Sequence, residues 1–118
     1  MSIPISLGEL PEVAARYGAT PYLLTVGRDA VPHAASVAVA WTDGRLVAGA
    51  GRHSAANIQE NDQVALLWPP IEPGGHSLIV DGWGDLRPSR SGLEVVIQPS
   101  RAVLHVTRRA PESPASCG

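Results

Sequence analysis

Short apolar segments separated by tight-turn signals run along most of the chain, and this spacing is the strongest constraint on the fold. The pair Asp43-Gly44, typical of a two-residue hairpin turn, lies between predicted strands at 33–41 and 45–49. A further turn at 27–30 follows a predicted strand at 20–26. Strands joined by such short turns pair antiparallel. The sequence therefore predicts a mainly β fold, in which closure into a barrel would remove exposed strand edges.

The second half of the chain also has the pattern of strands. Gly82 and Gly84 interrupt one apolar run, which indicates a bulge or a close approach of backbones. Pro99 interrupts the last run, because proline has no N–H for a sheet ladder. Strands are predicted at 63–68, 76–86, 93–97 and 102–106.

Two helices are predicted among these strands. The first covers 7–17, because Ser6 and Glu9 have the spacing of a capping box and apolar residues follow at helical intervals. The second covers 53–60, with Ser54 as its cap.

Length, charge and cysteine content indicate one small globular domain. The chain has 118 residues, a net charge of -2 and one cysteine. It lacks the basic surface expected for nucleic-acid binding, and no apolar run approaches the ~20 residues of a membrane span. Because no basic and apolar leader precedes Pro4 and Cys117 has no internal partner, we expect a cytoplasmic protein. The expected domain covers 1–109, and the tail at 110–118 is predicted to be disordered.

Two residue types are missing from the composition. All nine basic residues are arginine, so lysine Schiff-base chemistry and the phosphate-binding lysine of a P-loop are excluded. There is no phenylalanine and there are only five aromatic residues, so the core is expected to consist of aliphatic side chains. Trp68 and Trp83 are interpreted as core or interface anchors.

The segment 49–54 is the first candidate binding site, because it follows a predicted strand and precedes a predicted helix. It lacks the third glycine and the βαβ setting of a dinucleotide fingerprint. A helix N-terminus nevertheless binds phosphate through free N–H groups, and Arg52, His53 and Ser54 would add donors. The alternative is that Ser54 only caps the helix and that Arg52 is solvated.

One face of the strand at 33–41 is the second candidate feature, because it carries only small side chains. Such a face lets a helix, another sheet or a flat ligand approach closely. The small residues are Ala34, Ser36, Ala38 and Ala40.

Motifs for metal or nucleophilic chemistry are missing from the sequence. The four histidines are spaced too widely for a paired metal motif, so no metal site is predicted. No G-x-S-x-G elbow is present. Asp81 and Asp85 share one face of a predicted strand, where they would either pair as carboxylates or face solvent.

Four segments resemble, in the same order, the pyridoxamine 5′-phosphate oxidase-like, flavin-binding split-barrel family. The segment 22–33 is similar to the first hairpin of that family, and 57–67 to its "N-L-x-x-N-P-x-V-a-L" passage from helix to strand. The segment 79–86 resembles its "v-x-v-x-G-x-a-x-x-l" strand, and 99–105 resembles the closing strand of short members. The resemblance covers about residues 10–107.

This resemblance implies a six-stranded antiparallel split β-barrel with short flanking helices, acting as a homodimer. It also implies FMN or a deazaflavin at the dimer interface, with hydride or electron transfer to a small molecule. His33 and Ser36 are expected at the ring or substrate side. The residues expected at the cofactor phosphate are Arg52, His53, Ser54 and Asn57.

The phosphate end departs from the family pattern. Members usually carry arginine and lysine just ahead of this helix, where the chain has His53 and Ser54, with Arg52 one step earlier. Arg28 or Arg101 of a second copy would compensate for the missing charge.

Two alternative functions remain open. In the second hypothesis the protein keeps the barrel but has lost flavin, and it is a binding or accessory protein for another small molecule. In the third hypothesis the protein is a cofactor-free enzyme. The region after Trp83 is shorter than in the pyridoxamine phosphate oxidases, whose extra C-terminal segment serves dimerisation and substrate binding, so we do not expect pyridoxal phosphate synthesis.

Overall fold

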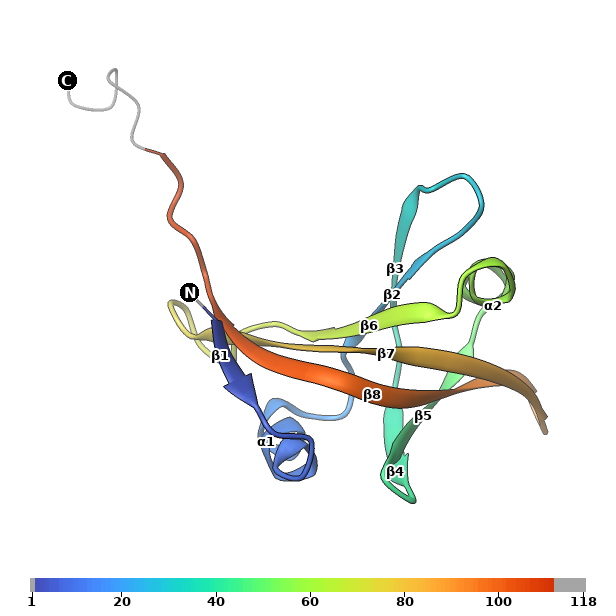
Figure 1. Cartoon of the computed structure of the whole chain (residues 1–118), viewed down its shortest axis with the longest axis horizontal. Helices are drawn as coiled ribbons and strands as arrows, with labels where there is room; N and C mark the ends of the chain where they lie inside the picture. Colours follow the sequence, from blue (N-terminus) through green and yellow to red (C-terminus); the bar gives the residue numbers. More distant parts are fainter. Residues whose placement is uncertain (1, 112–118) are drawn as a thin grey trace.

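The computed structural model describes residues 2–111, which form eight strands and two helices (Figure 1). In chain order the elements are β1 (Ser2–Ile5), α1 (Leu10–Tyr17), β2 (Tyr22–Val26), β3 (Pro32–Ser36), β4 (Val39–Thr42), β5 (Arg45–Ala50), α2 (Arg52–Glu60), β6 (Gln63–Trp68), β7 (His76–Ser89) and β8 (Gly92–Val106).

All strands belong to one antiparallel sheet with the order β3-β2-β6-β7-β8-β5-β4, and β1 pairs with β8. Although β3 and β4 stand at the two ends of this order, only Val37 and Ala38 separate them in the chain. The Val37 N–H donates to the Pro21 carbonyl at 3.0 Å. The Val39 N–H likewise donates to the Ala19 carbonyl at 2.8 Å. This segment therefore links the two ends of the sheet, and the sheet curls between them.

Residues 2–111 form eight strands, whereas the sequence pattern predicted seven and the family resemblance implied six. The predicted strand at 33–41 is divided into β3 and β4, because Val37 and Ala38 leave the ladder between them. The short strand β1 was not predicted. It pairs with the end of β8, with Ser2 opposite His105. No local pattern reveals a pairing between residues so far apart in sequence.

The prediction of two strands around Pro99 is wrong, because β8 runs through this residue without a break. Pro99 lies opposite Gly82, where the register of β7 and β8 shifts between Asp81 and Gly82. Such a shift leaves a residue outside the ladder, so a proline is accommodated there. A Cβ on Gly82 would lie 2.4 Å from the Gln98 carbonyl oxygen. The two backbones therefore approach closely at this point, as the glycines in the sequence indicated.

The core lies inside the curled sheet and is almost entirely aliphatic, as predicted from the missing phenylalanine. Trp68 is the one large aromatic residue in it, with 1% of its surface exposed. Its indole Nε1–H donates to the Gly18 carbonyl at 2.9 Å, which joins the sheet to the end of α1. Trp83, by contrast, lies on the surface and is 49% exposed. The fully buried strand residues are Leu23, Leu46, Leu66, Leu78, Val80, Val95 and Ile97.

Helix α1 covers one side of the sheet and buries Leu10, Val13 and Ala14. Its start differs slightly from the prediction. Ser6 and Glu9 make only one contact of the predicted capping box, in which the Ser6 hydroxyl accepts from the Glu9 N–H at 3.3 Å. The same hydroxyl donates to the Glu9 carboxylate at 2.7 Å, and the N-cap of the helix is Glu9, without a side-chain cap. The regular helix begins only after them.

Residues 107–111 extend beyond β8 without a helix or strand, and residues 112–118, with Cys117, lie outside the described residues. The disorder predicted for 110–118 and the sequence-based boundary at 109 remain predictions. Between residues 2 and 111, neither helix has the length and apolarity needed to cross a membrane.

Candidate functional site

Helix α2 begins directly after β5 and packs against β2, β3 and β7 (Figure 1). Its N-cap is Gly51, which has an extended backbone and makes no side-chain cap. Ser54 is buried in the first turn with 2% of its surface exposed, so the prediction that it caps the helix is wrong. Because the first N–H groups of a helix have no intrahelical acceptor, the start of α2 keeps free donors.

Two side chains one turn apart on α2, His53 and Asn57, meet the hairpin formed by β2 and β3. The His53 ring stacks on the His33 ring, with 4.0 Å between ring centroids and 22° between planes. The Asn57 amide Nδ2 donates to the Thr25 hydroxyl at 3.0 Å. Thr25 and His33 are themselves cross-strand partners. These four side chains therefore form one cluster, through which the first half of α2 contacts the hairpin.

Thr25 and Gly27 were not identified from the sequence. A Cβ on Gly27 would lie 2.3 Å from Asn57 Oδ1, so a glycine at this position leaves room for the amide. Thr25 is only 1% exposed, and a buried hydroxyl requires a partner, which Asn57 supplies. The sequence contained one signal for Thr25. It is a polar residue between Leu24 and Val26 in an otherwise apolar strand, where strand alternation places it on the same face as Leu23.

The residues predicted at the phosphate end fall into two groups. Arg52 and His53 are exposed at the start of α2, and among residues 2–111 Arg52 makes no ion pair. Ser54 and Asn57 are buried, at 2% and 7% exposure, and Asn57 joins the helix to β2 through its hydrogen bond to Thr25. An approaching anion would thus meet Arg52, His53 and the backbone N–H groups first.

The structure separates Arg28 from this group. Its guanidinium binds the Glu60 carboxylate at 2.8–3.2 Å through three hydrogen bonds. Glu60 is the last residue of α2, and a nine-residue helix is about 12 Å long, so Arg28 lies at the opposite end from Arg52. Arg101 lies on β8 opposite Asp81.

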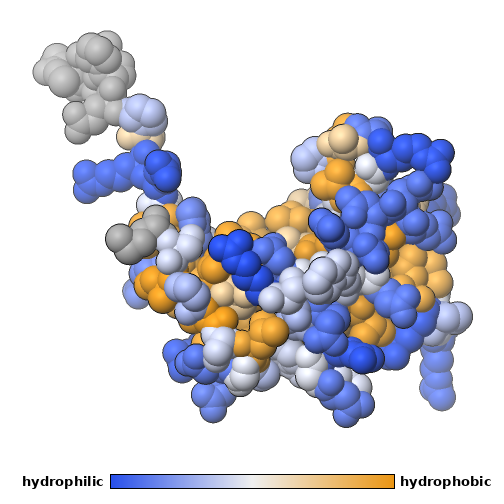
Figure 2. Space-filling view, in the orientation of Figure 1, coloured by the Kyte–Doolittle hydropathy of each residue, from blue (hydrophilic) through white to orange (hydrophobic). Residues whose placement is uncertain are grey.

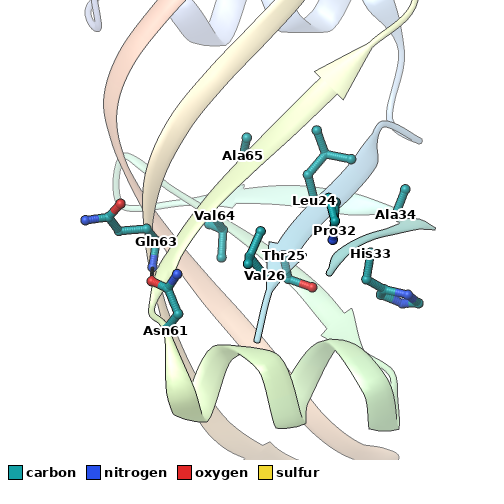
Figure 3. A pocket seen from close by; sticks show the side chains of 10 residues that line it. All are labelled: Leu24, Thr25, Val26, Pro32, His33, Ala34, Asn61, Gln63, Val64 and Ala65. Atoms are coloured by element: carbon teal, nitrogen blue, oxygen red, sulfur yellow. Dashed lines mark hydrogen bonds between the residues drawn. The ribbon is translucent and has the colours of Figure 1, made fainter. Parts of the chain in front are cut away.

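Residues on the ring side of the predicted site lie on two faces of β3. His33 points toward α2, whereas Ala34 and Ser36 lie on the outer face of the sheet. Figure 3 shows Ala34, Leu24 and Ala65 pointing to one side and His33 to the other. Ser36 pairs with Tyr22, whose side chain is 43% exposed. The alternation of side chains along a strand accounts for this separation.

The outer face of β3, β2 and β6 forms a shallow, mainly apolar hollow of about 430 Å³ (Figure 3). Leu24 lies at its centre, since it pairs with Ala34 on one side and with Ala65 on the other. Asn61 and Gln63 border it with amide groups. Figure 2 shows apolar groups of residues interrupted by hydrophilic ones on the face in view.

The donor set at α2 fits the anionic end of a phosphate-bearing cofactor. Arg52 supplies a permanent charge with planar donors, and His53 supplies a ring N–H. A Cβ on Gly51 would meet no atom within 4 Å, so there is open space beside the helix start. Among residues 2–111, no three histidine, cysteine or acidic side chains come together as metal ligands.

Solved structures define the class of fold. The chain is similar to a protein from Clostridium acetobutylicum of the pyridoxinephosphate oxidase family (TM-score 0.65, 10% identity, 86% of this chain and 91% of that one). It is also similar to a FAD-binding protein from Mesorhizobium loti (TM-score 0.66, 14% identity, 92% and 98%) and to an F420 reductase (TM-score 0.58, 20% identity, 71% and 88%). HutZ, a heme storage protein from Vibrio cholerae, shares the fold as well (TM-score 0.60, 14% identity, 81% and 93%).

The chain therefore has the fold of the pyridoxamine 5′-phosphate oxidase-like split-barrel proteins, which confirms the resemblance at the level of the fold. No family model matches it. Among curated proteins, uncharacterized proteins of Mycobacterium bovis and Mycobacterium tuberculosis are each 39% identical to it over 69 residues, which cover 56% of the chain and 48% of the relative. The chain thus spans about half the length of these relatives.

Proposed function

We propose that the protein is a small split-barrel oxidoreductase that binds a flavin or deazaflavin and transfers hydride or electrons to a small molecule. One observation carries the proposal: Arg52, without an ion pair among residues 2–111, stands beside the His33–His53 stack at the start of α2. The shared fold with a FAD-binding protein and an F420 reductase supports it.

The start of α2 would hold the cofactor phosphate. Arg52 would bind phosphate oxygens through its planar fork, and the free N–H groups of the first turn would donate to the same oxygens. His53 would add a ring N–H, with its orientation fixed by the stack on His33. Asn57 acts indirectly, because its bond to Thr25 keeps the helix start against the hairpin.

The cofactor ring would lie along the edge of β3, where Ala34 and Ser36 present only small side chains. Such a cofactor supplies hydride or electron transfer through its ring system. The protein would bind and orient the ring and exclude water from it. We assign no general acid or base.

We expect a homodimer in solution, formed through the outer face of β3, β2 and β6. Light scattering at micromolar concentration should give twice the monomer mass. Because Ala34 is exposed within the hollow, Ala34→Arg should yield a folded monomer, whereas Ala15→Arg, on an exposed position of α1, should remain a dimer. A monomeric wild-type protein would contradict an interface-built site.

Replacing Arg52 with alanine should weaken flavin binding about tenfold, because a charge-assisted hydrogen bond at an exposed position is lost. Fluorescence titration of the purified protein would measure this. Arg90→Ala removes the same charge from the turn between β7 and β8 and should leave the affinity unchanged. Equal losses in the two variants would show that the phosphate is held elsewhere.

A second candidate function is binding of a non-flavin small molecule without redox chemistry. The burial of Ser54 and Asn57 favours it, because only two exposed side chains remain at the phosphate end. The heme storage protein with this fold supports it as well. If a folded dimer binds neither FMN nor a deazaflavin, this second function is favoured over the first.

A further inference from the structure

The outer face of the sheet carries an apolar row that the core does not use. Tyr22, Leu67, Ile79 and Val103 are successive register partners on β2, β6, β7 and β8. None of the four belongs to the core cluster or to the side chains packed against it, and Tyr22 is 43% exposed. The water-covered face of an antiparallel sheet is normally polar, so an apolar row across four strands indicates a surface that another molecule covers.

Two opposite charges lie directly beside this row without pairing with each other. Asp81 and Arg101 are register partners on β7 and β8, two residues along each strand from Ile79 and Val103. No ion pair among residues 2–111 includes either of them. Opposite charges at facing positions of an antiparallel pair ordinarily attract each other. Both charges are therefore available to a partner.

A hollow of about 280 Å³ beside this pair offers acceptors for a guanidinium group. Asp81 borders it with a carboxylate, Gln63 with an amide and Ser100 with a hydroxyl. The Ser100 hydroxyl donates to the Asp81 carbonyl at 3.1 Å, which leaves its oxygen free to accept. A guanidinium carries five N–H donors and requires such acceptors. The same face thus presents an exposed arginine, Arg101, and beside it a hollow suited to an arginine.

A surface that carries a group and its complement side by side pairs with a second copy of itself about a two-fold axis, because each contact then occurs twice. We infer that the outer face of β6, β7 and β8 binds the same face of a second copy, with Arg101 of each copy bound to Asp81 of the other. The apolar row would supply the buried area, and the two ion pairs would fix the orientation of the copies.

This interface continues the surface at which the homodimer is proposed. Ala65 is the register partner of Leu24 on one side and of Asp81 on the other, so the hollow around Leu24 and the charged pair share one face. The inference rests on the homodimer of the proposed function and deepens it, because it extends the interface to β7 and β8 and names the contact that selects the partner.

Charge reversal at the two positions tests the contact. Asp81→Arg would set arginines against arginines across the axis, and Arg101→Asp would set aspartates against aspartates. Each variant should raise the dimer dissociation constant at least about 100-fold and be monomeric by light scattering where the wild type is a dimer. An equal mixture of the two variants should form a 1:1 dimer, because every arginine of one then meets an aspartate of the other.

Matched variants control for the charge change itself. Glu12→Arg, on an exposed position of α1, and Arg90→Asp, in the turn between β7 and β8, should both remain dimers. Circular dichroism would verify folding. If a single reversal at Asp81 or Arg101 failed to fold, the double variant Asp81→Arg/Arg101→Asp would decide, because it exchanges the charges and should again form a dimer.

The outcomes separate the inference from the function beneath it. If both single variants remain dimers, or if the two monomeric variants do not associate when mixed, the contact between Asp81 and Arg101 is refuted while flavin binding stands. A wild-type protein that is monomeric at micromolar concentration would overturn the inference together with the interface-built site. If a dimer with the expected charge dependence binds neither FMN nor a deazaflavin, the oxidoreductase function fails and the inference stands.

Discussion

Replacing Trp68 with alanine is expected to lower the free energy of unfolding by about 3–5 kcal/mol, the largest effect of any single change considered. The indole is 1% exposed and fills the core beside Leu66 and Leu78. Its Nε1–H also donates to the Gly18 carbonyl, so the substitution removes one of the hydrogen bonds between the end of α1 and the sheet. Urea denaturation at fixed protein concentration would measure the change.

Trp83→Ala provides the matched control, because it removes the same side chain from an exposed position. We expect that variant to lose about 1 kcal/mol or less, as surface substitutions do. Trp68→Phe should fall between the two, because the ring remains and the hydrogen bond is lost. If the two alanine variants proved equally stable, Trp68 would not be the core aromatic that joins α1 to the sheet.

A methyl group at Gly82 is expected to cost about 2–3 kcal/mol of stability, since overpacking at a rigid position forces the backbone to move. The new Cβ would lie 2.4 Å from the Gln98 carbonyl oxygen and 3.2 Å from Ile97 Cγ2. The first of these atoms belongs to the backbone of β8 and has no rotamer by which to retreat.

Gly49→Ala is the control for this effect, because Gly49 also lies within a strand and a Cβ there would meet no atom within 4 Å. That variant should be neutral or slightly more stable, because alanine restricts the unfolded chain. Thermal melts of the two variants side by side would decide the matter. A Gly82→Ala protein as stable as Gly49→Ala would argue against the close contact of β7 and β8 at the bulge.

The local features of the fold could be predicted because each depends on neighbouring residues. Asp43 and Gly44 both have positive φ angles, 51° and 77°, as the hairpin pattern indicated, and they join β4 to β5. The pairing of β1 with β8 could not be predicted, because it joins the two ends of the described chain. Pro99 misled the prediction because its place in a bulge depends on the facing strand.

The candidate site was predictable in its members but not in its arrangement. The sequence identified His33 and His53 for different parts of the site, whereas the structure stacks them. That contact depends on how α2 lies over the hairpin, which no local pattern determines. Ser36 and His33 lie on opposite faces of β3 because side chains alternate along a strand, so this separation could have been predicted from the sequence. The role of Thr25 required the structure, because its partner Asn57 lies on another element.

The most direct test of the proposed function is a cofactor titration of the purified wild-type protein. Its visible spectrum should be recorded first, and the colourless form then titrated with FMN and with a deazaflavin, followed by fluorescence. The proposal predicts a yellow protein as isolated or micromolar binding of at least one of the two cofactors. A folded protein that binds neither at millimolar concentration would contradict it.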